Sequence, residues 1–330
     1  MKVLRLIAWI LAWTVTLLCA AWTFGALYFD FPIVSLRAPA AVLFVLVLIG
    51  ALIWLPGKLL KLAAVFGAFG LVMCWWLTLK PTNDRHWQAD VAHVAWAEID
   101  GDEVTVHNVR NCDYRTETDF TPHWETRTVR LSQITGIDLA IMYWGSPWMA
   151  HPIVSFRFAD ALPLCFSIET RKAIGQTYSA LRGLYRQYML VYVVADERDS
   201  IRVRSNYRYG EEVYFYRTMV SPEQARTRFR EYLNTINALR DQPRWYNAIT
   251  NNCTTNIRTQ RSINERLPWD WRMLLNGKAD EMLYEHHAIA TGGLPFAKLK
   301  QRSLINPGAR AADQNPDFSR LIREGLPQGN

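Results

Sequence analysis

The residues with the clearest chemistry surround Cys253, which directly follows two asparagines. Asn251 and Asn252 belong to the residue types that cap helix N-termini, and a helix is expected over Thr254–Leu267. In the first helical turn, unpaired backbone N–H groups and the positive end of the helix dipole favour a thiolate, the form that attacks carbonyl carbons. The sequence therefore predicts a thiol nucleophile at Cys253. The alternative is a small, buried, apolar cysteine without chemistry.

A thiol nucleophile needs a base, and histidine is the usual one because its pKa lies near working pH. The chain has seven histidines, and His151 differs from the others because it opens an expected strand over Pro152–Phe158. An imidazole is then placed at the mouth of a sheet. The alternative is a solvated surface histidine.

The third candidate is Glu169. Expected strands over Pro152–Phe158 and Leu164–Glu169 are joined by a short turn and form a hairpin, with His151 and Glu169 nearly opposite at its open end. A carboxylate there would accept the second imidazole N–H and orient the ring. Other arrangements remain open: a slipped register that brings Ser167 or Thr170 forward, a solvent-side ion pair of Glu169 with Arg171 or Arg157, or Asp138 as the partner of His151.

The sequence predicts an α+β fold for the region that must position these groups. Short segments rich in β-branched and aromatic residues predict strands, and Ser221-Pro222-Glu223-Gln224 predicts a capped helix start. Further expected strands are Glu103–Val109, Trp124–Leu131, Met189–Ala195 and Val213–Tyr216. After residue 267 we expect two short helices, with Asn306–Asn315 as a loop.

The first third of the chain has a different composition. Leu6–Tyr28, Ala38–Gly57 and Leu62–Leu79 are uncharged apolar runs long enough to cross a bilayer as helices. The expected domains are thus a membrane anchor over residues 1–80 and a soluble domain over residues 81–330. A cleaved signal peptide is the alternative for the first run, but apolar residues continue beyond any small-residue cleavage site.

Basic residues predict the orientation of these spans. Lys2 and Arg5 precede the first span, and Lys58 and Lys61 lie between the second and the third. By the positive-inside rule the N-terminus is cytoplasmic. Three spans then place the soluble domain in the periplasm, anchored to a bacterial inner membrane.

The net charge of +7 does not indicate nucleic acid, because the basic residues are scattered among acids and aromatics. Membrane lipids or lipoproteins are the expected partners, with peptidoglycan as a further possibility. No metal-ligand spacing is present, so neither a metal nor another cofactor is expected. Cys112 and Cys165 could pair in an oxidising compartment, although sequence does not establish a pairing.

Several segments together resemble the Lnb N-terminal periplasmic domain family, in order and over roughly His86 to Pro327. They are residues 108–115, 143–145, 150–156, 167–171, 193–199 and 246–256. The resemblance implies a permuted papain-like (NlpC-type) fold in which histidine precedes cysteine. The pair Asn252-Cys253 also resembles the nucleophile motif of the lecithin:retinol acyltransferase family.

The resemblance implies Cys253 as nucleophile, His151 as base and Glu169 as orienting residue. We assign support of the thiol and the oxyanion to Asn252, Thr254 and Tyr246. The expected function is a cysteine acyltransferase or acyl hydrolase that acts on phospholipid or lipoprotein through a thioester. A cysteine amidase or peptidase for peptidoglycan peptides, or a non-enzymatic anchored scaffold, is the alternative. Apolar walls near Cys253 would favour lipid, and a polar cleft would favour a cell-wall peptide.

Overall fold

The computed structural model describes residues 2–260, 270–273 and 276–327, and the chain divides into two compact units. One unit contains Met1–Thr82 together with two later segments, Thr177–Met189 and Trp245–Ala248. The other contains Asn83–Gln176, Leu190–Arg244 and Ile249–Asn330. The expected division at residue 80 did not include the two later segments in the first unit.

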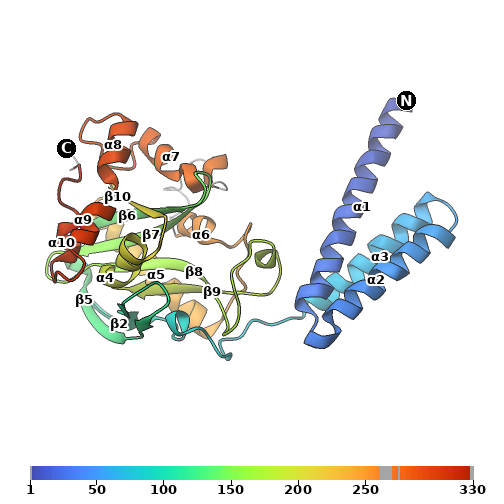
Figure 1. Ribbon diagram of the computed structural model, residues 1–330, viewed down its shortest axis with the longest axis horizontal. Helices are drawn as coiled ribbons and strands as arrows, with labels where there is room; N and C mark the ends of the chain where they lie inside the picture. The colour runs from blue at the N-terminus through green and yellow to red at the C-terminus, as the bar shows by residue number, and fades with distance from the viewer. Residues whose placement is uncertain (1, 261–269, 274–275, 328–330) are drawn as a thin grey trace. The chain divides into compact units, whose positions relative to one another are not determined.

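Three helices make up most of the first unit: α1 (Lys2–Asp30), α2 (Arg37–Trp54) and α3 (Lys58–Leu77), with a 3-10 turn η1 (Val34–Leu36) before α2. All three are long and apolar enough to cross a membrane, as predicted. Helix α1 packs against both α2 and α3, and the hairpin of α2 and α3 is visible in Figure 1.

The second unit is built on one large sheet whose order is β1-β2-β9-β8-β7-β6-β10, with β5 also paired to β2. These strands are β1 (Trp96–Asp100), β2 (Glu103–Arg110), β5 (Trp124–Arg130), β6 (Ile134–Trp144), β7 (Ala150–Phe158), β8 (Leu164–Arg171), β9 (Met189–Ala195) and β10 (Glu211–Arg217). A separate small ladder joins β3 (Asp113–Tyr114) and β4 (Phe120–Thr121). The α+β prediction is confirmed. The six expected strands are present, whereas β1, β3, β4 and β6 were missed.

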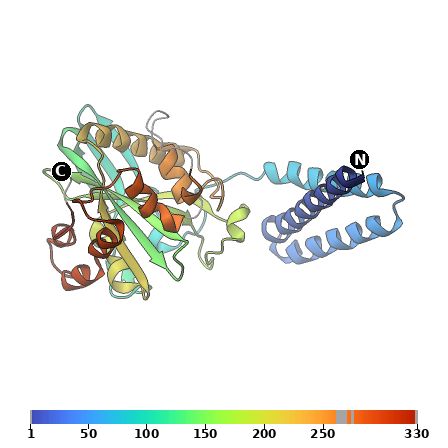
Figure 2. The ribbon, with the colours of Figure 1, turned by 90° about the horizontal axis from the view of Figure 1, so that it is seen from above.

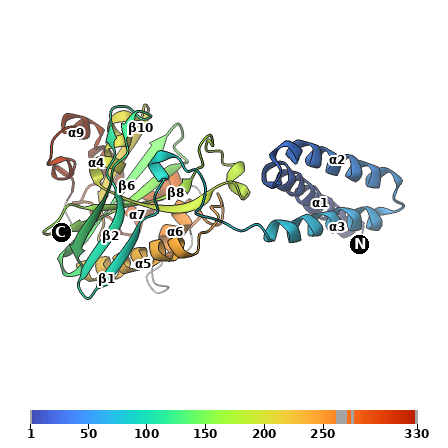
Figure 3. The ribbon, with the colours of Figure 1, turned by 90° about the horizontal axis from the view of Figure 1, so that it is seen from below.

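Helices cover both faces of this sheet. Helix α5 (Pro222–Asp241) lies along one face, where the Phe229 ring meets Phe156 and Phe166 edge to face. Its predicted start is confirmed, since Ser221 and Gln224 form a capping box. The other face carries α4 (Glu197–Ser200), the π-helical turn η5 (Val203–Tyr207) and α9 (Asn306–Ala311). Figures 2 and 3 show α5 and α9 on opposite sides of the sheet.

The C-terminal part is more helical than expected. It contains α7 (Ala279–Glu285), α8 (Phe296–Ser303), α9 and α10 (Phe318–Leu321). The prediction of a loop over Asn306–Asn315 was wrong, because α9 begins at Asn306 and buries Ala309 in the core. Pro307 favours this start, since proline is well suited to the first turn of a helix.

One arginine fastens α10 to the sheet. Arg323 donates two hydrogen bonds to the Glu197 carboxylate, at 2.7 and 2.6 Å, and a third to Asp138 Oδ2 at 2.8 Å. Ser155 donates to Glu197 as well, at 2.6 Å. Both carboxylates are buried, so this pairing compensates for their removal from water. Phe318 and Ile322 belong to the same core as β6 and β7.

Candidate active site

Cys253 is the first residue of helix α6 (Cys253–Thr259), one position earlier than the expected helix start. The Asn252 side chain accepts a hydrogen bond from the Thr255 backbone at 3.0 Å, and the Thr255 hydroxyl accepts one from the Asn252 backbone at 2.9 Å. This reciprocal cap fixes the chain direction into the helix, so the assignment of Asn252 as a capping residue is confirmed. Residues 261–267 of the expected helix lie outside the described residues.

The Cys253 thiol is partly exposed and has two polar neighbours. Its Sγ lies 3.9 Å from Thr254 Oγ1 and 3.8 Å from Asn276 Nδ2. Burial raises the pKa of Cys253, and hydrogen bonds from Thr254 and from the Cys253 backbone lower it only in part. The expected thiolate is therefore not the resting form. The helix N-terminus does favour the charge, but desolvation of the sulfur outweighs it.

Asn276 is a site residue that sequence reasoning missed. It lies in the 3-10 turn η8 (Asn276–Lys278), where its Nδ2 donates to Thr254 Oγ1 at 3.0 Å and its Oδ1 accepts from the Ala150 backbone at 2.8 Å. Its amide thereby links the thiol end of α6 to the first residue of β7, next to His151. Gly277 permits this approach, because a Cβ there would overlap the backbone of residues 147–149.

His151 and Glu169 lie opposite each other, as the hairpin predicts. Strands β7 and β8 are antiparallel with Ile153 opposite Ser167, and the same register two residues further along brings His151 opposite Glu169. His151 Nε2 is 3.8 Å from Glu169 Oε1. Ser167 lies between them: its Oγ is 2.7 Å from His151 Nε2 and donates to Glu169 Oε1 at 2.8 Å.

This chain of contacts fixes the tautomer of His151. Ser167 has one hydroxyl proton, and a carboxylate can only accept, so that proton is directed to Glu169. Ser167 must then accept from His151, whose Nε2 carries the proton. Nδ1 is the unprotonated nitrogen of the neutral ring. Nδ1 is therefore the nitrogen that can accept a proton.

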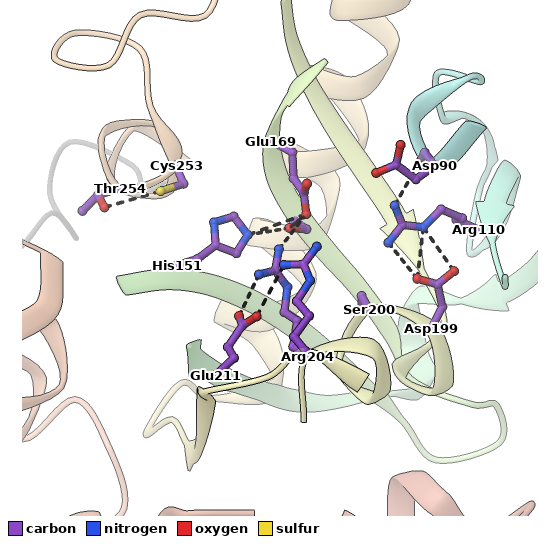
Figure 4. Close-up of polar contacts among 12 residues, drawn as sticks. Asp90, Arg110, His151, Glu169, Asp199, Ser200, Arg204, Glu211, Cys253 and Thr254 are labelled. Carbon is purple, nitrogen blue, oxygen red and sulfur yellow. Dashed lines mark hydrogen bonds and ion pairs between the residues drawn. The ribbon is translucent and has the colours of Figure 1, made fainter. Parts of the chain in front are cut away.

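Glu169 is held as a carboxylate. Burial opposes its charge, but Arg204 at 3.1 Å and His151 outweigh burial and hold the pKa of Glu169 well below its usual range. Arg204, from η5, also pairs with Glu211 at 2.9 Å, so the guanidinium bridges two acids (Figure 4). Burial, reinforced by the positive charge of Arg204, lowers the pKa of His151 to about 3. His151 is therefore neutral at physiological pH.

Asp138, Arg157 and Arg171, the alternative partners of His151 and Glu169, make other contacts. Asp138 is bonded to Arg323 and lies opposite Ser155, four positions along β6 from the partner of His151. Glu169 pairs with Arg204, whereas Arg157 lies against Asp138 and Arg171 donates to backbone carbonyls.

Two further cysteines and the candidate support residue Tyr246 are buried. Cys112 and Cys165 are buried free thiols in different clusters, so the disulfide left open by the sequence is not formed. Tyr246 is buried, and its backbone N–H donates to the Tyr188 carbonyl.

In Figure 4 the imidazole is drawn between Cys253 and the Glu169 carboxylate, with its hydrogen bond directed to the acid side. Helix α6 packs against both β7 and β8. Within the described residues no hydrogen bond joins Cys253 to His151. The structure thus shows an assembled imidazole, hydroxyl and carboxylate, together with a thiol whose pKa burial raises. Closer approach of Sγ to Nδ1 is required before proton transfer, as is common in ligand-free enzymes.

These charge states predict the pH dependence of thiol reactivity. The rate of Cys253 alkylation by iodoacetamide should rise about tenfold per pH unit and continue to rise above pH 9, because a raised pKa keeps the thiolate fraction small. No step is expected between pH 5 and pH 7, because His151 stays neutral there. Mass spectrometry of the peptide that carries Cys253 measures this rate separately from the other thiols. An inflection between pH 5 and pH 8 would instead indicate a thiolate–imidazolium pair.

Residues 120–277, just under half of the chain, match the model of the Lnb N-terminal periplasmic domain family. The resemblance seen in the sequence is confirmed for this segment, which contains His151, Ser167, Glu169, Cys253 and Asn276. The matched segment is shorter at both ends than the expected one. No curated protein and no solved structure matches the chain.

Proposed function

We propose that this chain, whose residues 120–277 belong to the Lnb N-terminal periplasmic domain family, is a membrane-anchored cysteine acyltransferase or acyl hydrolase for phospholipid or lipoprotein. Three helices suited to crossing a membrane precede that domain. The basic residues around them support an inner-membrane anchor with a cytoplasmic N-terminus and a periplasmic domain. The papain-like relationship of histidine and cysteine is part of the same proposal.

The observation that carries the proposal is an apolar cavity beside the thiol. It has a volume of about 470 Å³, which is the size of a small-molecule site. Thr254 and Asn276, the two side chains in contact with Cys253, are part of its wall. Most of the remaining wall is aliphatic, including Leu139, Ile141, Val154, Ile257, Met282 and Leu283. Such a wall suits an acyl chain, whereas a cell-wall peptide would need polar partners.

The chemistry follows from the tautomer of His151. Nδ1 removes the proton from Cys253, and Sγ attacks the ester carbonyl, so that a C–S bond forms and the carbonyl electrons move to oxygen. The backbone N–H groups at the start of α6 stabilise this oxyanion. The C–O bond then breaks, and His151 returns the proton to the leaving alcohol. An amine, hydroxyl or water afterwards cleaves the thioester, again with His151 as base.

A covalent adduct tests the proposal. After incubation of the full-length protein in detergent with phospholipid, intact-mass analysis should show one added acyl group, and peptide mapping should place it on Cys253. Cys253→Ala should show none. Absence of an adduct on the native protein, together with release of peptides from peptidoglycan, would instead favour the amidase alternative.

A cavity variant strengthens this test. Ala288 lines the cavity, so Ala288→Trp should block long acyl chains and leave adduct formation from a short-chain thioester intact. Ala159→Trp is the matched control, because Ala159 is an exposed residue in the turn between β7 and β8. If Ala288→Trp reduced adduct formation from long and short chains equally, the cavity would not be the site that holds the acyl chain.

A further inference from the structure

The side-chain amide of Asn276 has a defined orientation at the thiol. The Ala150 backbone N–H can only donate, so the Asn276 atom that lies 2.8 Å from it is the carbonyl oxygen Oδ1. The Nδ2 end of the amide therefore faces the start of α6. Nδ2 carries two hydrogens: it donates one to Thr254 Oγ1 at 3.0 Å, and Cys253 Sγ, at 3.8 Å, is within reach of the other. The amide thus directs a donor at the reacting sulfur.

The turn that carries this amide is held through the backbone of Gly277. Its N–H donates to the Trp148 carbonyl at 3.1 Å, and its carbonyl accepts from the Tyr143 hydroxyl at 3.0 Å. The Tyr143 side chain is itself buried. These contacts and the bond from Ala150 fix the position of the amide, and a donor whose position is fixed stabilises developing charge without reorganisation.

The amide also lies where the apolar cavity meets the thiol. Asn276 and Thr254 are both part of the cavity wall, and both contact Cys253 Sγ. An acyl chain in the cavity would bring its carbonyl carbon to Sγ, with the carbonyl oxygen beside this polar part of the wall. Thr254 Oγ1 already accepts a hydrogen bond from Asn276, whereas Asn276 Nδ2 has a second hydrogen to donate. The carbonyl oxygen can therefore accept from Asn276.

We propose that Asn276 is a catalytic residue: its Nδ2 donates a hydrogen bond to the oxyanion that forms when Cys253 attacks an acyl carbonyl. As the C–S bond forms, the carbonyl electrons move to oxygen, and Nδ2–H and the backbone N–H groups at the start of α6 share the resulting charge. The electrons return to the C=O bond when the alcohol leaves, and Asn276 neither gains nor loses a proton. This inference rests on the acyl transfer proposed above.

Asn276→Asp in the full-length protein tests this inference. One carboxylate oxygen can still accept from the Ala150 backbone, so the change conserves the shape of the residue and one of its contacts. The other oxygen replaces the donor with an acceptor and brings a negative charge towards the oxyanion. We expect kcat for an acyl ester to fall by about 10² to 10³, the range for loss of one oxyanion donor, with KM near its native value.

Two inhibitors separate stabilisation of the oxyanion from binding of the chain. The Cys253 thiol adds to the carbonyl of a long-chain trifluoromethyl ketone, which places a negative oxygen where the oxyanion forms. The alcohol of the same chain fills the cavity without reacting. Asn276→Asp should weaken binding of the ketone about a hundredfold and leave binding of the alcohol unchanged, because only the ketone develops the charge. Protection of Cys253 from iodoacetamide measures both affinities. Equal weakening of the two would assign Asn276 to chain binding and overturn the inference.

Asn315→Asp is the matched control, because Asn315 is exposed between α9 and α10 and its side chain also accepts from a backbone N–H, that of Asp317. It should leave turnover and both affinities unchanged. Asn276→Ala removes the donor without adding a charge and should show the same selective loss of ketone binding, to a smaller extent. Native ketone affinity in Asn276→Ala would contradict the assignment.

The buried thiols of Cys112 and Cys165 report on the fold of each variant, since they should stay unreactive towards iodoacetamide. Protection from alkylation does not depend on acyl transfer. A native protein that turns over no acyl ester, but binds the ketone and loses that binding in Asn276→Asp, would refute the proposed function alone. Ester turnover that is equal in the native protein and in Asn276→Asp would refute the role of Asn276 alone.

Discussion

His151→Ala should lower the turnover of an acyl ester by about 10² to 10⁴, the range for lost general-base assistance. The effect should fall on kcat, because the tautomer leaves Nδ1 of His151 as the group that takes the thiol proton. Steady-state kinetics and the rate of adduct formation on Cys253 measure it. Circular dichroism checks that β7 and its sheet remain folded.

His123→Ala is the control for the loss of an imidazole, because His123 is exposed and its backbone carbonyl bonds to Asn111. It should leave turnover unchanged. If His151→Ala kept the native turnover, another group would be the base. That result would contradict the site described above.

Glu169→Gln should lower kcat by about tenfold to a hundredfold and leave KM near its native value, a smaller loss than that of His151→Ala. The amide oxygen can still accept from Ser167 and so keep the ring oriented. It lacks the negative charge that stabilises the imidazolium formed when His151 takes the thiol proton. Arg204 keeps Glu211 as its second acid, so the fold should survive.

Ser167→Ala separates the orientation of the His151 ring from the effect of the negative charge on Glu169. It removes the acceptor of the His151 Nε2 proton but leaves the Glu169 carboxylate, 3.8 Å from that nitrogen, able to move closer. We expect a loss no greater than that of Glu169→Gln. If Glu169→Gln and His151→Ala lowered kcat equally, the carboxylate would have a further role. The ion pair of Arg204 with Glu211 would then be tested first.

The position of Glu169 opposite His151 was predictable because it depends on local pattern, whereas Ser167, which contacts His151 directly, was expected only from a slipped register. Two strands joined by a short turn form a hairpin, and the register of that hairpin decides which side chains face each other. The same reasoning found the capped start of α5. Both cases depend on residues that are close in sequence.

Features set by distant contacts were not predictable. Strand β6 was missed because Gly136 and Asp138 interrupt its apolar pattern, and the buried Asp138 is compensated by three arginines from distant segments, Arg157, Arg217 and Arg323. Asn276 belongs to no motif with the thiol. The raised pKa of Cys253 depends on the burial of the sulfur, which the capping signature does not report.

The clamp formed by Arg323 implies an order of assembly. Polypeptides fold while they emerge from the N-terminal end, and the sheet strands that carry His151 and Glu169, as well as Cys253, all emerge before α10. Until Arg323 is synthesised, Glu197 lacks the arginine that bonds it, Asp138 has only Arg157 and Arg217 beside it, and the core shared by β6 and β7 lacks Phe318 and Ile322. All strands of the sheet and the Cys253 thiol are thus synthesised before the C-terminal residues that cover this face of the sheet. A nascent chain of this protein therefore carries all of its candidate reacting groups before one face of its sheet is covered.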